Sequence, residues 1–127
     1  MIGQMDHVAL SVPDLDERIK FLTTQLGMTL KRIGTHVKTG GRIAMIADAN
    51  GFKLELIEMP DAELGLQHVA YRVEDVDASY QQLLDGGCTS IRPPHGLAAA
   101  KATTALVQDQ SNLQIQLIKY DPDSPDL

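Results

Sequence analysis

The first half of the chain has a hydrophobic pattern that predicts one strand, one helix and three further strands. Apolar residues alternate with other types over residues 6–12, which is typical of a strand. The helix runs from its capping residue Asp14 to residue 26, with Leu15, Ile19 and Leu22 on its apolar face. The remaining strands are expected at residues 28–33, 43–47 and 52–58.

The second half repeats this order of elements. A strand is expected at residues 67–73, a helix at residues 76–84 behind the capping residue Asp75, and strands at residues 88–91, 102–107 and 113–119. Residues 92–96 contain two prolines and are expected to form a rigid loop, and the tail at residues 121–127 is expected to fray. Each half is therefore a predicted βαβββ module. The modules cover about residues 1–60 and about residues 61–120 of one α+β domain.

Residues with metal-binding side chains recur at one spacing in the two halves. His7 and His68 begin equivalent strands, and Glu55 and Gln116 lie in equivalent final strands, since 68 − 7 and 116 − 55 both equal 61. A single buried histidine usually finds a backbone partner, but two at equivalent positions favour a shared ligand. Glu55 lies on an otherwise apolar strand, where an unpaired carboxylate is costly to bury. The pattern therefore predicts one divalent metal, with zinc, nickel, cobalt, manganese and iron(II) all compatible.

Composition narrows the choice of partner. The chain has 127 residues and a formal net charge of −6, and no apolar run reaches the ~18 residues that suggest a membrane span. Nucleic acids and anionic membranes bind clustered basic surfaces, so a small-molecule partner is expected, with no nucleic acid and no membrane. A single cysteine, Cys88, and an N-terminal segment without the features of a secretory signal predict a cytoplasmic protein.

Four stretches resemble the vicinal oxygen chelate superfamily, which includes glyoxalase I, methylmalonyl-CoA epimerase, extradiol dioxygenases and bleomycin-resistance proteins. They are DHVALSVPDL at residues 6–15, LGM at 26–28, DANGFKLEL at 48–56 and GLQHVAYRVED at 65–75. The resemblance implies that the two modules form a cupped, eight-stranded half-barrel around one metal. It also implies that His7, Glu55, His68 and Gln116 are the ligands, and that the protein is a homodimer.

The same resemblance implies a lyase or an isomerase that stabilises an enediolate or enolate. Related isomerases place a catalytic glutamate at position 116, but Gln116 cannot take up a proton, so Glu55 is the expected base as well as a ligand. Relatives that act on glutathione adducts have an arginine and an asparagine where this chain has Ser11 and Met59. One alternative is an antibiotic-binding resistance protein without chemistry. Another is an iron(II) dioxygenase, because two histidines and one carboxylate also form that type of site.

Other polar residues are candidates for contact with a substrate. His36 and His95 lie in loops expected to border the cavity, and a histidine with a pKa near ~6.5 can act as acid or base. Arg42, Arg72 and Arg92 could bind a carboxylate or phosphate through two hydrogen bonds. Arg72 is the best of the three because period-two alternation puts it on the same strand face as His68.

Overall fold

The computed structural model describes residues 3–36 and 39–127, and over these ranges it has eight strands and two helices. Residues 1–2 belong to the segment without signal features, and residues 37–38 belong to the loop expected around His36. Both pairs lie outside the described residues. The chain divides into two compact units. The N-terminal unit comprises residues 7–67, and the C-terminal unit comprises residues 68–127 together with the described residues before His7.

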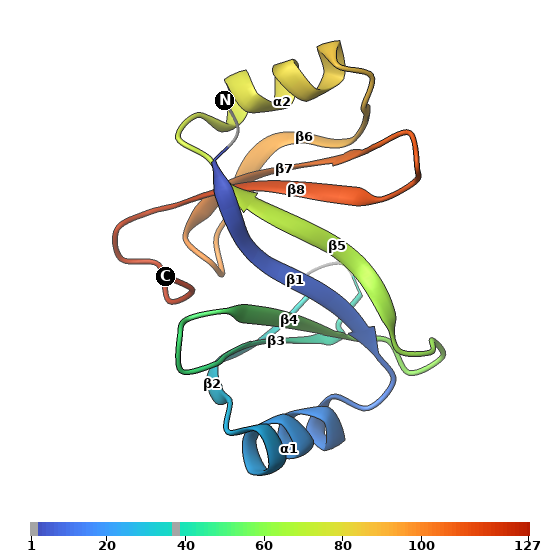
Figure 1. Cartoon of the computed structure of the whole chain (residues 1–127), viewed down its shortest axis with the longest axis vertical. Coiled ribbons are helices and arrows are strands. Elements are labelled where there is room, and N and C mark those ends of the chain that lie inside the picture. The colour runs from blue at the N-terminus through green and yellow to red at the C-terminus, as the bar shows by residue number, and fades with distance from the viewer. Residues whose placement is uncertain (1–2, 37–38) are drawn as a thin grey trace. The chain divides into compact units, whose positions relative to one another are not determined.

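The N-terminal unit has one helix against one face of its strands (Figure 1). Its elements are β1 (Gln4–Val12), which begins in the other unit, α1 (Leu15–Leu26), β2 (Thr29–Thr35), β3 (Arg42–Ala47) and β4 (Lys53–Glu58). The strand order is β2-β3-β4-β1, in which β1 runs parallel to β4 and the other pairs are antiparallel. Leu15 and Leu22 of α1 pack against Leu56 of β4 in a core that Val12, Ala44 and Ile46 complete.

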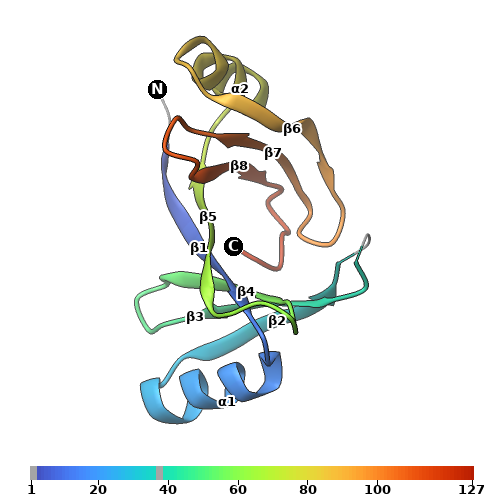
Figure 2. The same cartoon turned by 90° about the vertical axis from the view of Figure 1, so that its right-hand side faces the viewer.

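The C-terminal unit has the same organisation, with its helix beside the strands in Figure 2. Its elements are β5 (Gly65–Arg72), which begins in the N-terminal unit, α2 (Val76–Asp85), β6 (Thr89–Leu97), β7 (Ala102–Gln108) and β8 (Gln114–Tyr120). The strand order is β5-β8-β7-β6, with β5 parallel to β8. Val76 of α2 packs against Val73, Ala105 and Leu117. The prediction of two βαβββ modules is confirmed.

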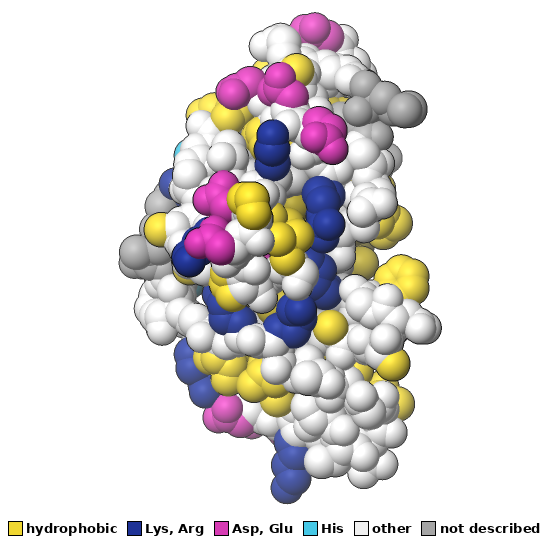
Figure 3. Space-filling view, turned by 90° about the vertical axis from the view of Figure 1, so that its left-hand side faces the viewer, with side chains coloured by type: hydrophobic (Ala, Val, Ile, Leu, Met, Phe, Trp, Pro, Cys, Tyr) yellow, Lys and Arg dark blue, Asp and Glu magenta, His cyan; other side chains and the backbone are white. Residues whose placement is uncertain are grey.

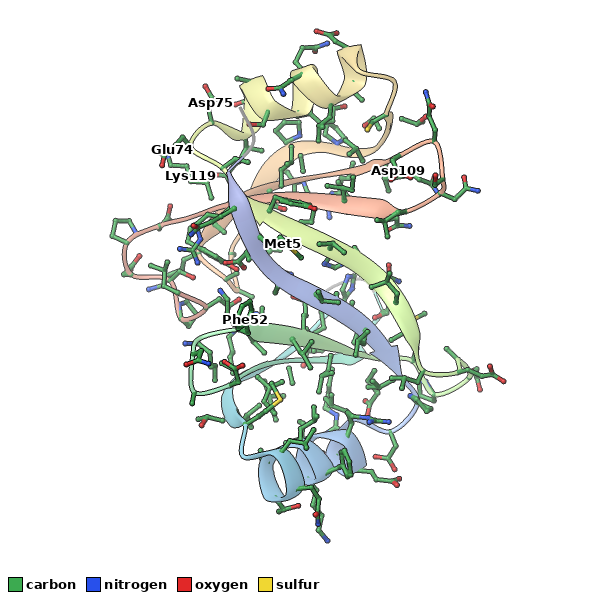
Figure 4. All side chains as sticks on the ribbon, in the orientation of Figure 1. Met5, Phe52, Glu74, Asp75, Asp109 and Lys119 are labelled. Carbon is green, nitrogen blue, oxygen red and sulfur yellow. The ribbon has the colours of Figure 1, made fainter. Side chains whose placement is uncertain are left out.

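Both predicted helix caps are confirmed. The Asp14 carboxylate accepts a hydrogen bond from the Glu17 backbone N–H at 3.0 Å, and the Asp75 carboxylate accepts one from the Ala78 N–H at 3.0 Å. Figure 4 shows Asp75 at the start of α2. Gly27 ends α1 with a φ of 68°, a left-handed conformation that costs glycine little. The two aspartates therefore satisfy backbone donors that each helix end leaves exposed.

The loop expected at residues 92–96 is instead part of a strand. β6 continues from Thr89 to Leu97, with shifts of register on both sides of Arg92. In the C-terminal unit β6 pairs only with β7, so it is an edge strand. Proline lacks a backbone donor, and edge strands and bulges are the places where a sheet tolerates it. The loop prediction was wrong because the sequence does not show which strand lies at an edge.

The tail at residues 121–127 is packed, so the prediction that it frays was also wrong. Backbone N–H groups of Asp121 and Ser124 donate to Lys101 and Asp121 carbonyls at 2.8 Å and 3.0 Å. The Ser124 hydroxyl donates to the Ala100 carbonyl, and Lys101 Nζ lies 2.8 Å from Asp123 Oδ2. Ala100 and Lys101 lie in the turn before β7. The tail is therefore held by hydrogen bonds to a segment about twenty residues earlier, as the separation of 24 between Ser124 and Ala100 shows.

Charged side chains of both signs occur on the face of the molecule shown in Figure 3. The net charge of −6 is therefore not a uniform negative field over that face. Over the described residues, neither helix has the length and apolar character needed to cross a membrane.

An arginine joins three elements of the N-terminal unit. Arg42 of β3 donates through Nε and Nη2 to the Glu58 carboxylate at 3.1 Å and 2.8 Å, and through Nη1 and Nη2 to Asp16 of α1 at 2.9 Å and 3.1 Å. Glu58 Oε2 also accepts the Leu15 N–H at the start of α1 at 3.4 Å. This arrangement gives Arg42 a structural role, because its guanidinium is held by two carboxylates.

We expect Arg42→Gln to make the free energy of unfolding less dependent on pH in acid. Hydrogen bonds from Arg42 lower the pKa of the Glu58 carboxyl below its ordinary value of 4.5 and the pKa of Asp16 below 3.8. A carboxyl whose pKa is lower in the folded state stabilises the protein above its unfolded pKa, and this stabilisation is lost as the pH falls through the folded value. Urea unfolding between about pH 6 and pH 2 measures the difference.

Arg92→Gln is the matched control, because it makes the same change at an exposed arginine of β6. It should unfold with the pH dependence of the wild type. If Arg42→Gln also kept the wild-type dependence, the three-residue network would not contribute to stability.

Candidate functional site

The first and last strands of each unit pair in parallel with the same register. In the N-terminal unit Ala9 of β1 pairs with Glu55 of β4, and in the C-terminal unit Ala70 of β5 pairs with Gln116 of β8. Since 70 − 9 and 116 − 55 both equal 61, the sequence repeat is also a repeat of hydrogen-bond register. Each histidine lies two residues before the paired alanine, so it occupies the same place in both strand pairs.

His7 and Glu55 lie on the sheet face of the N-terminal unit that α1 does not cover. The alternate residues Leu10, Leu54 and Leu56 pack into the core beneath α1, and period-two alternation turns His7 and Glu55 the other way. His7 Nε2 is 3.9 Å from Glu55 Oε2, and the side chains are 1% and 16% exposed. The two groups therefore lie close together, with the carboxylate the more accessible.

His68 and Gln116 have the same relation to the C-terminal unit. Tyr71, Val73 and Leu117 pack toward α2, so His68 and Gln116 lie on the opposite face. Gln116 Nε2 donates to Thr104 Oγ1 at 2.9 Å. Gln116 Oε1 is buried and has no hydrogen-bond partner among the described residues. The amide is therefore anchored through its nitrogen, and its oxygen is an unused acceptor.

The donor types and their surroundings in each unit fit a divalent metal. Imidazole nitrogen, carboxylate oxygen and amide oxygen are all ligands for such ions. An ion about 2.1 Å from each of two ligand atoms can join atoms up to about 4.2 Å apart, and the 3.9 Å between His7 Nε2 and Glu55 Oε2 lies within this reach. In the C-terminal unit, the buried oxygen of Gln116 is the kind of group that a metal would satisfy.

Arg72, a candidate for substrate contact, is held by buried partners in the C-terminal unit. Its Nη2 donates to Asp6 Oδ1 at 2.7 Å, and its guanidinium lies 5.3 Å from the centre of the Tyr120 ring. The Tyr120 hydroxyl donates to Asp6 Oδ2, and the Asp6 side chain is completely buried. Gly3 passes so close that an added Cβ would lie 1.8 Å from the Arg72 carbonyl oxygen. These contacts attach the start of β1 to β5 and β8.

The two other candidate histidines make local contacts. The His36 backbone N–H donates to the Gly41 carbonyl at 2.7 Å, close to the hairpin between β2 and β3. His95 lies on β6, where its Nδ1 is 2.8 Å from the Pro93 carbonyl oxygen. A carbonyl can only accept, so Nδ1 is the donor in this contact. Contact of either histidine with a substrate stays a prediction.

The family model for the Glyoxalase/Bleomycin resistance protein/Dioxygenase superfamily matches residues 4–117. The chain belongs to this superfamily. The match extends over nearly all of both repeats, and it confirms the resemblance that the repeated strands indicated.

Two curated proteins are similar to the chain at low identity. A probable chloroplastic lactoylglutathione lyase of Arabidopsis thaliana is 27% identical over 127 residues, which cover 94% of this chain but only 36% of that protein. A probable lactoylglutathione lyase of Vibrio parahaemolyticus is 26% identical over 125 residues, covering 92% of this chain and 91% of that protein. The chain thus spans about a third of the first relative's length, 36%, and most of the second's.

A similar solved structure confirms the fold. The crystal structure of methylmalonyl-CoA epimerase from Mycobacterium tuberculosis matches with a TM-score of 0.82 and 24% identity, over 95% of this chain and 90% of that one. At this identity the likeness concerns the fold. The α+β fold class and its glyoxalase-like arrangement of two βαβββ modules are therefore established.

Sequence reasoning missed two polar residues beside the candidate ligands, Asp6 and Thr104. Asp6 directly precedes His7, but its partners Arg72 and Tyr120 are 66 and 114 residues away. Thr104 lies within a strand that had been predicted, with nothing in its local pattern to distinguish it from Thr103. Only the pairing of β7 with β8 brings Thr104 to Gln116.

We expect Arg72→Met to lower the free energy of unfolding by about 3 kcal/mol, because it removes a cation that lies against a buried carboxylate. Methionine keeps most of the apolar stem of arginine, so the decrease in the free energy of unfolding measures the contribution of the charge and the hydrogen bond. Urea unfolding followed by circular dichroism measures the change.

Lys119→Met is the matched control, since it removes an exposed cation from β8 (Figure 4). It should change stability by no more than about 0.5 kcal/mol. An equally small effect for Arg72→Met would contradict a structural role for the Asp6–Arg72 pair.

Proposed function

We propose that the protein is a metal-dependent enzyme of lyase or isomerase type, which moves a proton on a carbon next to a carbonyl group. The observation that carries this proposal is the shared register of β1–β4 and β5–β8, because it gives each unit a histidine and an oxygen donor at the same positions. Superfamily membership supports the class of reaction, since the similar proteins are named lactoylglutathione lyases and methylmalonyl-CoA epimerase.

Four side chains would hold one divalent ion. His7 and Glu55 would come from the N-terminal unit, and His68 and Gln116 from the C-terminal unit. Zinc, nickel, cobalt, manganese and iron(II) all accept this combination of imidazole and oxygen donors. Such an ion supplies a Lewis acid for the negative charge that develops on substrate oxygens.

Glu55 is the side chain to which we assign the proton transfer. Gln116 has no titratable group, so the base cannot lie at the equivalent place in the C-terminal unit. The Glu55 side chain is also more exposed than that of His7, at 16% against 1%, which gives its second oxygen better access to a substrate. A carboxylate can bind an ion through one oxygen while the other accepts a proton.

The substrate is proposed to be a small carbonyl compound other than a glutathione adduct. Ser11 and Met59 occupy the places where relatives acting on such adducts carry an arginine and an asparagine. The Ser11 hydroxyl is used within the N-terminal unit, where it donates to the Gly65 carbonyl at 3.3 Å. Acyl-CoA esters are therefore the first candidates, in keeping with the name of the similar epimerase. His36, His95 and Arg72 are the further side chains proposed to contact this substrate.

Two further expectations accompany this function. A homodimer is proposed from the resemblance, and large exposed apolar side chains support it, such as Phe52 at 74% and Met5 at 59% (Figure 4). Light scattering on the purified protein measures this state. We also propose a cytoplasmic location, which fractionation of the native host would check.

We expect the protein to bind one equivalent of a divalent transition metal at micromolar affinity or better. His7→Ala should weaken binding at least about 100-fold, because even residues that only support metal ligands contribute 10- to 100-fold. Elemental analysis of protein purified without chelator, followed by calorimetric titration with nickel, zinc, cobalt, manganese and iron(II), measures this.

His95→Ala is the matched control, since it removes a histidine outside the proposed ligand set, and it should bind metal like the wild type. A wild-type protein that bound none of these ions would overturn the enzyme proposal. That result would favour an antibiotic-binding protein without chemistry. Iron(II)-dependent uptake of oxygen with a catechol would instead indicate a dioxygenase.

We expect Glu55→Gln to abolish proton exchange at the substrate carbon, with a loss of about 100-fold or more, because glutamine cannot act as a base. Deuterium incorporation from heavy water, followed by NMR at saturating metal, measures exchange for a panel of acyl-CoA esters, dicarbonyl adducts and catechols. At saturating metal the variant has its ion bound, so a lower exchange rate reflects the missing base and not weaker metal binding.

Glu74→Gln makes the same change at an exposed site between β5 and α2, labelled in Figure 4. It should exchange protons at the wild-type rate. If Glu55→Gln also retained the wild-type rate with its metal bound, Glu55 would not be the base.

A further inference from the structure

A buried threonine is hydrogen-bonded to the Gln116 side chain. Thr104 lies on β7, is 4% exposed and donates its hydroxyl proton to the Leu117 carbonyl oxygen at 2.8 Å. The same Thr104 Oγ1 accepts a hydrogen bond from Gln116 Nε2 at 2.9 Å. Thr104 pairs with Ile118 and Leu106 pairs with Gln116, so Thr104 and Gln116 are diagonal neighbours across β7 and β8.

The direction of these hydrogen bonds follows from the number of protons available. A threonine hydroxyl has one proton, and a backbone carbonyl can only accept. Because Thr104 gives its proton to Leu117, its oxygen can act only as an acceptor toward Gln116. The NH₂ end of the amide must then face Thr104, and Gln116 Oε1 must point away from it. This is the oxygen that is buried without a hydrogen-bond partner among the described residues.

We propose that Thr104 is a positioning residue, which presents Gln116 to the metal as a neutral oxygen ligand. This inference rests on the proposed function, because it assigns the Gln116 oxygen to the metal of that site. Thr104 itself touches neither metal nor substrate. It prevents the amide from rotating by half a turn, which would present nitrogen, a donor with no lone pair to offer a metal.

The same geometry favours glutamine over glutamate at position 116. A carboxylate has two acceptor oxygens and no donor, so one of them would face the lone pairs of Thr104 Oγ1. Thr104 could meet it with a proton only by releasing the Leu117 carbonyl, which now accepts that proton at 2.8 Å. Thr104 and Gln116 are therefore a matched pair. The pair leaves Glu55 as the sole carboxylate among the four proposed ligands.

The first test of this inference needs no metal. In metal-free wild-type protein, the Gln116 side-chain NH₂ signals should exchange slowly with solvent, because one N–H donates to buried Thr104. The exposed Gln82 provides the fast-exchanging comparison in the same spectrum. Loss of a signal pair in Gln116→Ala assigns the resonances. If the Gln116 signals exchange as fast as those of Gln82, the proposed orientation is overturned. This result on the wild type would be decisive regardless of how the Thr104 variants behave.

The second test changes the threonine. Thr104→Val keeps the shape and removes the hydroxyl, so it should shift the Gln116 NH₂ signals and weaken cobalt(II) binding about 10- to 100-fold, as loss of a group that orients a ligand does. Thr104→Ser should restore wild-type signals and affinity. Thr103→Val makes the same change at the exposed neighbouring residue of β7 and should leave both unchanged.

The outcomes separate this inference from the proposed function. If the wild type binds cobalt(II) and Thr104→Val binds it equally well with unchanged Gln116 signals, Thr104 does not position the ligand and the proposed metal site stands. If Thr104→Val loses affinity but Thr104→Ser does not recover it, packing rather than the hydroxyl is responsible and the inference is overturned. If the wild type binds no cobalt(II) or other ion, the proposed function fails first.

Discussion

Parallel hydrogen bonding between the first and last strand of each unit determines which side chains can serve a common ligand. Such a pair cannot be closed by a tight turn and needs a longer connection, which a helix and two strands provide in each unit. The spacing from histidine to oxygen donor is 48 residues in both units (55 − 7 and 116 − 68). The intervening helix covers one sheet face. Residue alternation then leaves the histidine and the oxygen donor together on the other face. The register of the parallel strand pair thus determines which polar side chains come together on that face.

Salt bridges fix the elements that carry these residues. In the N-terminal unit Arg42 connects β3 to the ends of α1 and β4, and in the C-terminal unit Arg72 attaches the start of β1 to β5. The two are not equivalent by the repeat, since 72 − 42 is 30 rather than 61. The two units therefore share the same order of elements, but each has a salt-bridged arginine at a different position. Sequence shows the charge of these side chains but not whether a carboxylate of the same chain already holds them.

Local signals in the sequence were enough to place the helices and most strands, because caps such as Asp14 and Asp75 act within one turn of the helix. The candidate ligands were also accessible from sequence, since an internal repeat transfers information between distant residues. The features that the sequence did not predict depend on contacts between residues that are distant in the chain. The prolines at 93 and 94 are tolerated because β6 is an edge, and the tail is ordered because Ser124 reaches Ala100. The orientation of Gln116 depends in the same way on Thr104.

The inequality of Glu55 and Gln116 has a chemical consequence for the proposed site. One carboxylate and three neutral ligands leave a divalent ion with a formal charge of +1, whereas a second carboxylate would cancel that charge. A site with residual positive charge would stabilise negative charge on a substrate oxygen more strongly than a site without net charge. When Glu55 takes up a proton its hold on an ion would weaken, and the three other proposed ligands would still hold the ion. A neutral Gln116 is therefore consistent with a catalytic role for Glu55, rather than a sign that catalysis has been lost.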